Sequence, residues 1–415
     1  MLDHLDDIDW ARLGHAYGSA ADVPDQLRAL RSPDEKVRKD ALGALYANIF
    51  HQGTRYEASA YAVPFLLELL ADPATPDRDW LLHLLTSLAI GYDESWLPDG
   101  VAIAEHRDAA QGGRELLAAK PPPWTDDEDD SDDEDDDSDD GYEDGDKEYV
   151  EYAYVESLSE ADQGRLWAYI ALAGYDAVRA GVPLFRDLLT DPDQGVRVGA
   201  AYALAWFPEE AAGSVPALVA AAESGRTPGE TATALVAAGL LGAAPDAALL
   251  TDPRPVVRWA AAVARARVLG DRTDDATVDE LLRWSAVVPE PAGDDDSVPF
   301  LGGDLSGYAG TALRHAGPRH ADRAFDALLD RLPRVDGKEA LRVTAEALRL
   351  AFPDGRLPAG TPATALTPAQ RRLADTLVGA PGAWLIDGRR FGNFEMLLME
   401  YGLPRDRDEL AGYLG

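Results

Sequence analysis

Cysteine is absent from this chain of 415 residues, which excludes disulfides and thiolate chemistry. Long apolar runs are absent too, because Asp, Arg or Pro interrupts every stretch before it reaches the ~18 residues of a membrane-spanning helix. The first seven residues are acidic and lack the apolar core of a signal peptide. We therefore expect a cytoplasmic protein that does not enter a membrane.

Positive charge is scarce. The chain has 38 Lys and Arg against 75 Asp and Glu, for a net charge of -37. Residues 126–148 hold 17 acidic residues and one lysine, so they carry -16 of that charge and leave -21 elsewhere. No basic stripe is present to bind nucleic-acid phosphates. The charge favours a protein partner with a basic surface and disfavours nucleic acid.

A short phrase recurs along the chain: a proline, then Val-Arg four residues on, then an alanine. Its three copies are Pro33-x-x-x-Val37-Arg38-x-x-Ala41, Pro192-x-x-x-Val196-Arg197-x-x-Ala200 and Pro253-x-x-x-Val257-Arg258-x-x-Ala261. A second phrase opens with Val63-Pro64, Val182-Pro183 and Val215-Pro216. Repetition at fixed offsets predicts an array of helix pairs.

Each first phrase also predicts a helix start. Ser32 can act as N-cap with Pro33 in the first turn and Glu35 completing a capping box. Asp191-Pro192 and Asp252-Pro253 are expected to open helices in the same way. Alternation typical of strands is rare, so we expect all regular structure to be helical.

These phrases resemble the HEAT-repeat family, including its short bacterial variants, over residues 20–95 and 160–285. The resemblance implies an all-α, HEAT-like α-solenoid of stacked antiparallel helix pairs, with a concave face built from the second helix of each pair. Between the helical blocks, like charges and few apolar residues predict a disordered acidic insertion. The expected segments are repeats at 1–120, the insertion at 121–148, repeats at 149–286, a loop at 287–303, repeats at 304–352 and capping helices at 353–415.

The densest polar and aromatic cluster in the repeats supplies the first candidate site: His51, Gln52, Arg55, Tyr56 and Glu57. An imidazole, an amide, a phenol and a carboxylate together can form a binding or acid–base site. The alternative is a turn network, in which Gly53 takes a positive φ, Thr54 caps the next helix and Glu57 completes a capping box.

Arg389, Arg390 and Phe391 form the second candidate, in a segment rich in arginines and aromatics. This segment could contact a peptide or an anion, or its aromatics could shield the end of the array. Arg38, Arg197 and Arg258 share one repeat position, where they either form a ladder facing a ligand or pair with acidic groups of the adjoining repeat. The second role is the usual one.

Catalytic, phosphate-binding and metal-binding motifs are missing, so no cofactor is expected. Asp136-x-Ser138-x-Asp140-Gly141 begins like a calcium loop, but Lys147 stands where a bidentate Glu is required. Gly302 to Gly307 is glycine-rich without lysine, and we expect Asp304 to cap a helix there. His315 and His320 flank Gly317-Pro318 and do not share a helical face as zinc ligands would.

The sequence therefore favours a non-enzymatic scaffold or inhibitor that grips a protein partner on its concave face. Toxin-neutralising immunity in bacteria is one concrete form of this role, which the acidic charge suggests. The alternative is an enzyme, because HEAT-like families include bilin lyases and an alkylpurine DNA glycosylase. A glycosylase would need a basic groove, against which the net charge argues.

Overall fold

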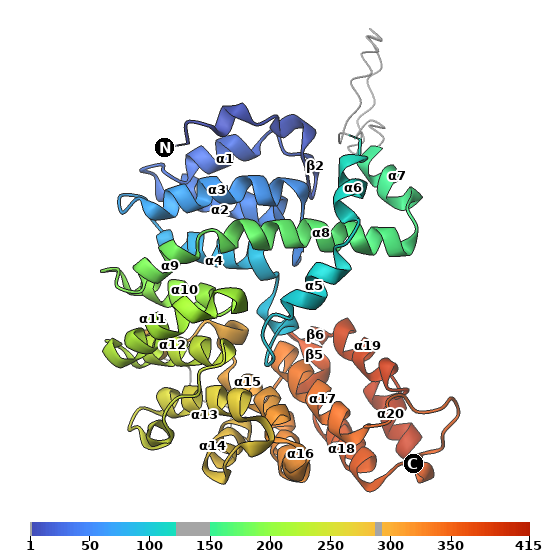
Figure 1. Cartoon of the computed structure of the whole chain (residues 1–415). Coiled ribbons are helices and arrows are strands. Elements are labelled where there is room, and N and C mark those ends of the chain that lie inside the picture. Colours follow the sequence, from blue (N-terminus) through green and yellow to red (C-terminus); the bar gives the residue numbers. More distant parts are fainter. Residues whose placement is uncertain (1, 122–149, 287–292) are drawn as a thin grey trace. The chain divides into compact units, whose positions relative to one another are not determined.

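The computed structural model describes residues 2–121, 150–286 and 293–415. It is all-α, with short helical elements that follow one another along the chain (Figure 1). Two compact units are present, one of Met1–Ser95 with Val101–Leu188 and one of Trp96–Gly100 with Leu189–Gly415. From residue 122 on, the predicted acidic insertion and its calcium-like loop lie outside the described residues. No helix of the described ranges is both long and apolar enough to cross a membrane.

The first unit is built around α8, the long helix that packs against α3, α4, α5 and α6 (Figure 1). A Cβ on Gly174 of α8 would lie 2.9 Å from the carbonyl oxygen of Leu88 in α4, so glycine allows this close approach. The unit contains the α-helices α1 (Val23–Ala29), α2 (Glu35–Asn48), α3 (Glu57–Ala71), α4 (Arg78–Ile90), α5 (Ile103–Ala109), α6 (Gly113–Ala118), α7 (Val150–Ser157), α8 (Glu160–Arg179) and α9 (Val182–Leu188). Its 3-10 helices are η1 (Leu5–Asp7), η2 (Trp10–Arg12) and η3 (Asp93–Ser95).

In the second unit, α12 and α13 pack closely through small residues. A Cβ on Gly239 would lie 2.5 Å from that of Ala264. The α-helices are α10 (Gln194–Leu204), α11 (Ala211–Ser224), α12 (Pro228–Leu240), α13 (Pro255–Leu269), α14 (Asp275–Ser285), α15 (Leu305–Ala312), α16 (Ala321–Arg331), α17 (Gly337–Ala351), α18 (Pro368–Gly379), α19 (Gly392–Glu400) and α20 (Arg407–Leu414). The 3-10 helices η4 (Pro208–Glu210), η5 (Ala247–Thr251), η6 (Gly270–Arg272), η7 (Asp294–Asp296), η8 (Phe300–Gly303), η9 (Leu313–Ala316), η10 (Pro318–His320), η11 (Leu332–Arg334), η12 (Ala363–Ala365) and η13 (Pro381–Trp384) connect them.

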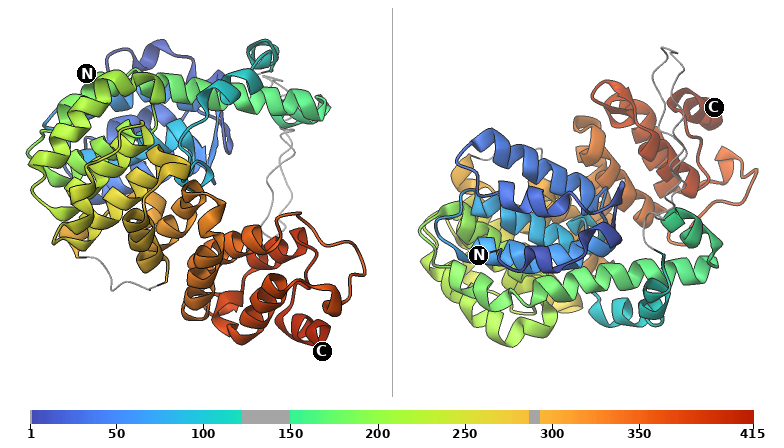
Figure 2. Two further views of the ribbon diagram at one scale, coloured as in Figure 1. Left: turned by 60° about the horizontal axis from the view of Figure 1, so that its bottom comes forward. Right: turned by 90° about the horizontal axis from the view of Figure 1, so that it is seen from above.

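The C-terminal helices of this unit share one continuous apolar core, which draws side chains from α16 through α20. These helices, orange to red in Figure 2, gather in one group in both views.

Asp304 accepts a hydrogen bond from Gly307 N at 2.7 Å, so the predicted cap of α15 is confirmed.

Residues 96–100 form a short strap that belongs to the second unit, although the chain on either side belongs to the first. The Arg267 guanidinium donates to the carbonyl oxygen of Asp99 through Nε at 3.0 Å and Nη2 at 2.6 Å. His315 Nε2 lies 3.3 Å from the carbonyl oxygen of Pro98. These contacts fix the strap by its backbone.

The predicted position of the repeat prolines was wrong by two residues. Pro33 precedes the N-cap of α2, which is Asp34 rather than Ser32. The Asp34 carboxylate accepts from Lys36 N at 2.9 Å, while Ser32 Oγ accepts from Asp34 N at 3.1 Å. The serine therefore closes a turn through the proline, and the better cap, an aspartate, starts the helix.

The other two copies form the same turn, although the N-cap of α13, Arg254, makes no side-chain capping hydrogen bond. Asp191 and Asp252 close the turns through Pro192 and Pro253 by accepting from the backbone N–H two residues on, each at 2.9 Å. Asp193 then caps α10 by accepting from Val196 N at 3.0 Å. All three prolines thus lie in the preceding turn and not in the first turn of a helix.

The predicted all-α fold is confirmed, but its regular structure is not exclusively helical. Three antiparallel ribbons are present, each of two strands of two residues: β1 (Gly14–His15) with β2 (Gly18–Ser19), β3 (Phe50–His51) with β4 (Thr54–Arg55), and β5 (Leu385–Ile386) with β6 (Arg389–Arg390). No sheet of three or more strands occurs in the described part of the chain. Two of the ribbons coincide with the two candidate sites.

Candidate functional site

The first candidate site is a β-hairpin. Phe50 pairs with Arg55 and His51 with Thr54, which leaves Gln52 and Gly53 as the two-residue turn. Both turn residues have positive φ, 50° and 88°, as a type I′ turn requires. The positive φ predicted for Gly53 is therefore confirmed. The predicted capping by Thr54 and Glu57 was wrong, because α3 begins after Tyr56, whose N–H donates to Ser59 Oγ at 2.8 Å.

Exposed aromatic side chains flank the hairpin. Tyr17 is 55% exposed and lies edge-on to His51, with ring centroids 5.4 Å apart and its hydroxyl 3.4 Å from Nδ1. Tyr92 is 48% exposed and packs against Phe50 at 5.6 Å. A Cβ on Gly53 would lie 2.9 Å from the Tyr92 ring, so glycine also makes room for it. We call Tyr17, His51 and Tyr92 the hairpin face.

A hydrogen-bond network around the buried His15 holds the backbone of Tyr17 in place. His15 Nδ1 accepts from Tyr17 N at 3.1 Å, so Nε2 carries the proton that it shares with Asp22 Oδ1 at 3.1 Å. Asp22 Oδ2 accepts from Gln26 at 2.6 Å and from Asn48 at 2.8 Å. Both nitrogens of His15 are therefore occupied, which makes this histidine a support for the face rather than a general base.

Arg55 turns inward from the hairpin. Its Nη1 donates to the carbonyl oxygen of Gly53 at 2.7 Å, and burial lowers its pKa to about 10. Tyr56 packs edge-on against Trp167 of α8, with centroids 6.2 Å apart. These two residues anchor the hairpin to the unit, while His51 and Gln52 remain at its tip.

Glu57 also lies away from the tip. Its carboxylate forms an ion pair with Lys120 at 3.0 Å, and both side chains are largely buried. The pair lines a pocket of ≈ 440 Å³ together with Tyr61. The structure thus divides the five predicted residues between an exposed tip and an inward-facing base.

The second candidate site is another type I′ hairpin, with Asp387 at φ 51° and Gly388 at φ 73°. Arg389 and Arg390 are exposed on its second strand, where Arg390 Nε donates to Glu395 at 2.8 Å. Phe391 is buried in the C-terminal core. Only the two arginines of this cluster are accessible to a ligand.

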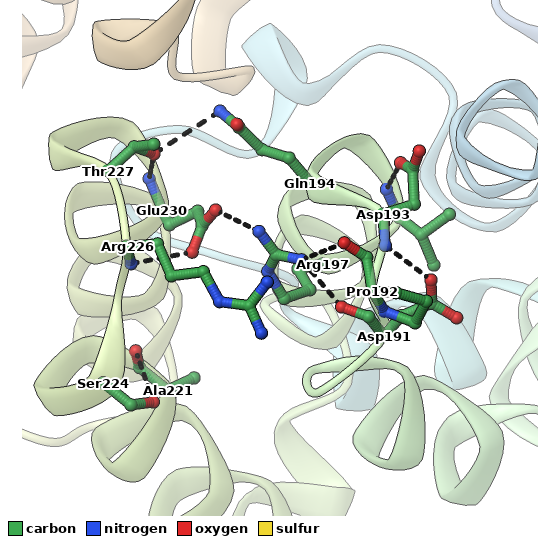
Figure 3. A network of polar contacts seen from close by, with 11 residues as sticks. Asp191, Pro192, Asp193, Gln194, Arg197, Ala221, Ser224, Arg226, Thr227 and Glu230 are labelled. Carbon is green, nitrogen blue, oxygen red and sulfur yellow. Dashed lines mark hydrogen bonds and ion pairs between the residues drawn. The ribbon is translucent and has the colours of Figure 1, made fainter.

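The three repeat arginines make one shared set of contacts. In each copy Nη1 donates to the carbonyl oxygens five and six residues back, as Arg197 does to Asp191 at 2.7 Å and to Pro192 at 2.8 Å (Figure 3). Each also pairs with a carboxylate of a later helix. Arg38 pairs with Asp77, the N-cap of α4, Arg197 with Glu230 in the first turn of α12, and Arg258 with Glu280 in the middle of α14. The arginines therefore join a turn to a neighbouring helix.

Residues 151–239 match the family model described as HEAT repeats. This segment is therefore assigned to the HEAT repeats. No curated protein matches the chain. The matched segment includes Arg197 and its repeated sequence motif. The ion pair of Arg197 with Glu230 is the contact expected of an arginine that pairs with the adjoining repeat. The ion pairs of Arg38, Arg197 and Arg258 confirm that these arginines pair with acidic groups.

Sequence reasoning missed Tyr17 and Tyr92, which no motif marks. They approach the hairpin only because β1–β2 and the end of α4 fold beside it. Within the described ranges no three His, Asp or Glu side chains are grouped so as to hold a metal ion. The side chains of the hairpin face itself are two half-exposed phenols and an imidazole.

Proposed function

We propose that this protein is a non-enzymatic scaffold or inhibitor that binds a protein partner through the hairpin face of its first unit. The observation that supports this is a pair of half-exposed tyrosines that contact the hairpin, Tyr17 at His51 and Tyr92 at Phe50. Tyrosines presented rigidly contribute much to binding because they bury a large area at little cost in conformational entropy. HEAT repeats in general serve as protein-interaction scaffolds.

The proposed partner has a basic surface, because the chain carries a net charge of -37. Charge of one sign steers an oppositely charged protein toward it and raises the association rate. The partner would lie on the concave side of the repeats, in a bacterial cytoplasm. A toxin neutralised by this chain is the most concrete candidate.

The experiment is an affinity capture with the full chain, followed by titration of the captured protein in pure form. We expect a Tyr17→Ala/Tyr92→Ala variant to bind that partner at least about tenfold more weakly, which corresponds to roughly 1.4 kcal/mol. Tyr61→Ala is the matched control, since Tyr61 is an exposed tyrosine of the same unit. Equal affinity of the double variant and the control would refute the proposal.

The rival class is an enzyme of the bilin-lyase or DNA-glycosylase kind. Genes for pigment or DNA repair beside this one would support it, whereas a toxin or secretion gene would support the inhibitor.

The two exposed arginines of the second hairpin, Arg389 and Arg390, are proposed as a separate contact for acidic groups of the same protein partner.

A further inference from the structure

A pocket of ≈ 280 Å³ opens in the second unit where α10, α11 and α12 meet. Its floor is apolar and is made by Leu189, Ala201 and Ala234, which are all buried. Its polar wall contains Arg197, Arg226 and Glu230 (Figure 3). This combination of an aliphatic floor and a cationic wall is the feature that carries the inference.

Arg197 differs from its two counterparts at one atom. In the other copies Nε faces the carboxylate of a later helix, at 2.7 Å from Asp77 for Arg38 and at 3.4 Å from Glu280 for Arg258. Arg197 instead reaches Glu230 through Nη2 at 2.5 Å. Its Nε, on a side chain that is nine-tenths buried, has no hydrogen-bond partner in the described structure. This Nε is itself covered by protein atoms, so Arg197 contributes positive charge to the pocket wall rather than a free donor.

Arg226 supplies a second cation at this wall. Its side chain is exposed, forms no ion pair within the described residues and extends toward the Arg197–Glu230 pair (Figure 3). Both oxygens of Glu230 are already engaged, Oε1 by Arg197 and Oε2 by Arg226 N at 3.0 Å. The single carboxylate thus balances one of the two guanidinium groups, which leaves a net positive charge facing the pocket.

We propose that this pocket binds a carboxylate that carries a short aliphatic tail. The carboxylate would accept from the Arg226 guanidinium, the positive charge of the buried Arg197 would favour it, and the tail would cover the floor of Leu189 and alanines. Charge-assisted hydrogen bonds from arginine are among the strongest that proteins form. This ligand chemistry belongs both to a free branched-chain acid and to the C-terminal residue of a peptide.

The site is independent of the hairpin face, because it uses other residues and takes a ligand of opposite charge to the proposed basic partner. Failure of either proposal leaves the other standing. The test uses the full chain and isothermal calorimetry with 4-methylpentanoate. Its neutral amide is the first control, since it keeps the tail and removes the charge.

We expect the acid to bind and the amide to bind about tenfold more weakly or not at all, given the strength of hydrogen bonds to charged groups. Arg226→Gln should weaken binding of the acid to a similar degree, and Ala221→Leu should prevent that binding because the larger side chain fills the pocket. Arg272→Gln is the matched control, because it removes an exposed arginine of the same unit that does not line the pocket. N-acetyl-Ala-Ala-Leu distinguishes the two sources: tighter binding than the acid indicates a peptide end, and weaker binding indicates a free acid.

Four results would overturn the proposal. The amide could bind as tightly as the acid, or Arg226→Gln could bind like the unmodified protein although it is folded by circular dichroism. Inorganic phosphate could bind where the acid does not, which would assign the cationic wall to a different anion. Absence of binding by both the acid and the peptide would reject the site.

Discussion

At the scale of single residues, arginine performs three separate tasks in this chain. The repeat arginines join a turn to a neighbouring helix, Arg55 anchors a hairpin from within, and Arg226 remains exposed at a pocket. The planar guanidinium suits the first task, because its several donors can satisfy two carbonyls and a carboxylate together. One residue type therefore has different roles according to burial and partners.

Replacement of Arg197 by alanine tests the first task. Glu230, which is 8% exposed, would keep its charge without its ion-pair partner. We expect a loss of about 3–5 kcal/mol in the free energy of unfolding, as is typical when one partner of a buried pair is removed. Urea unfolding of the variant measures this. The same change at Arg38, whose partner Asp77 is more exposed, should cost less, and equal losses would contradict the argument.

His315 gives the second unit a pH dependence. Burial lowers its pKa from the ordinary value of 6.5, despite the opposing effects of Pro98 and Asp99. The neutral form is thus favoured in the folded state, so its contribution to stability is present above pH 6.5 and declines as the pH falls toward the folded pKa. We expect the stability advantage of the unmodified protein over His315→Gln to shrink from pH 7 to about pH 5. An advantage that is constant with pH in urea unfolding would contradict this.

At the scale of elements, the two type I′ hairpins show what a glycine contributes. Gly53 and Gly388 both occupy the second turn position with positive φ. A Cβ at Gly388 would meet nothing within 4 Å, whereas one at Gly53 would meet the Tyr92 ring at 2.9 Å. Comparing alanine substitutions at the two glycines therefore separates two free-energy costs: that of a positive φ in a residue with a Cβ, and that of displacing a neighbouring side chain.

Gly388→Ala should therefore lower the free energy of unfolding only by the cost of a positive φ in alanine, about 1–2 kcal/mol. Gly53→Ala should lower it more, because it also pushes Tyr92 out of position, and it should weaken partner binding as well. Urea unfolding compares the stabilities, and titration with the partner compares the affinities. If Gly388→Ala proved the more damaging of the two, the role given to Tyr92 would be wrong.

The helical elements could be predicted from the sequence, and the details of their ends could not. The repeated Pro-x-x-x-Val-Arg phrase marked the correct helices, but Asp34 outcompeted Ser32 as the cap and moved the start. The Asp387-Gly388 pair is a hairpin signal that the helical periodicity around it concealed. The burial of Glu57 depends on Lys120, far along the chain, which no local pattern reveals.

At the scale of the whole molecule, charge is the dominant property. With a net charge of -37, association with a basic partner should be fast at low salt. We expect the association rate constant to fall steeply as ionic strength rises, because the screening length shortens to ~8 Å at physiological salt. Stopped-flow or surface-plasmon measurements across a salt series test this. A rate that does not change with salt would show that steering by charge plays no part.

The strap of residues 96–100 has a consequence for dissecting the protein into fragments. The chain leaves the first unit at Ser95, contributes five residues to the second and returns at Val101 before its final crossing after Leu188. Neither unit is therefore one uninterrupted stretch of sequence. A fragment that ends at residue 188 would carry Pro98 and Asp99 without Arg267 and His315, and the complementary fragment would expose the surface that the strap covers. A single proteolytic cut near residue 188 would leave both pieces tethered through the strap, so co-elution of the nicked halves is the expected behaviour.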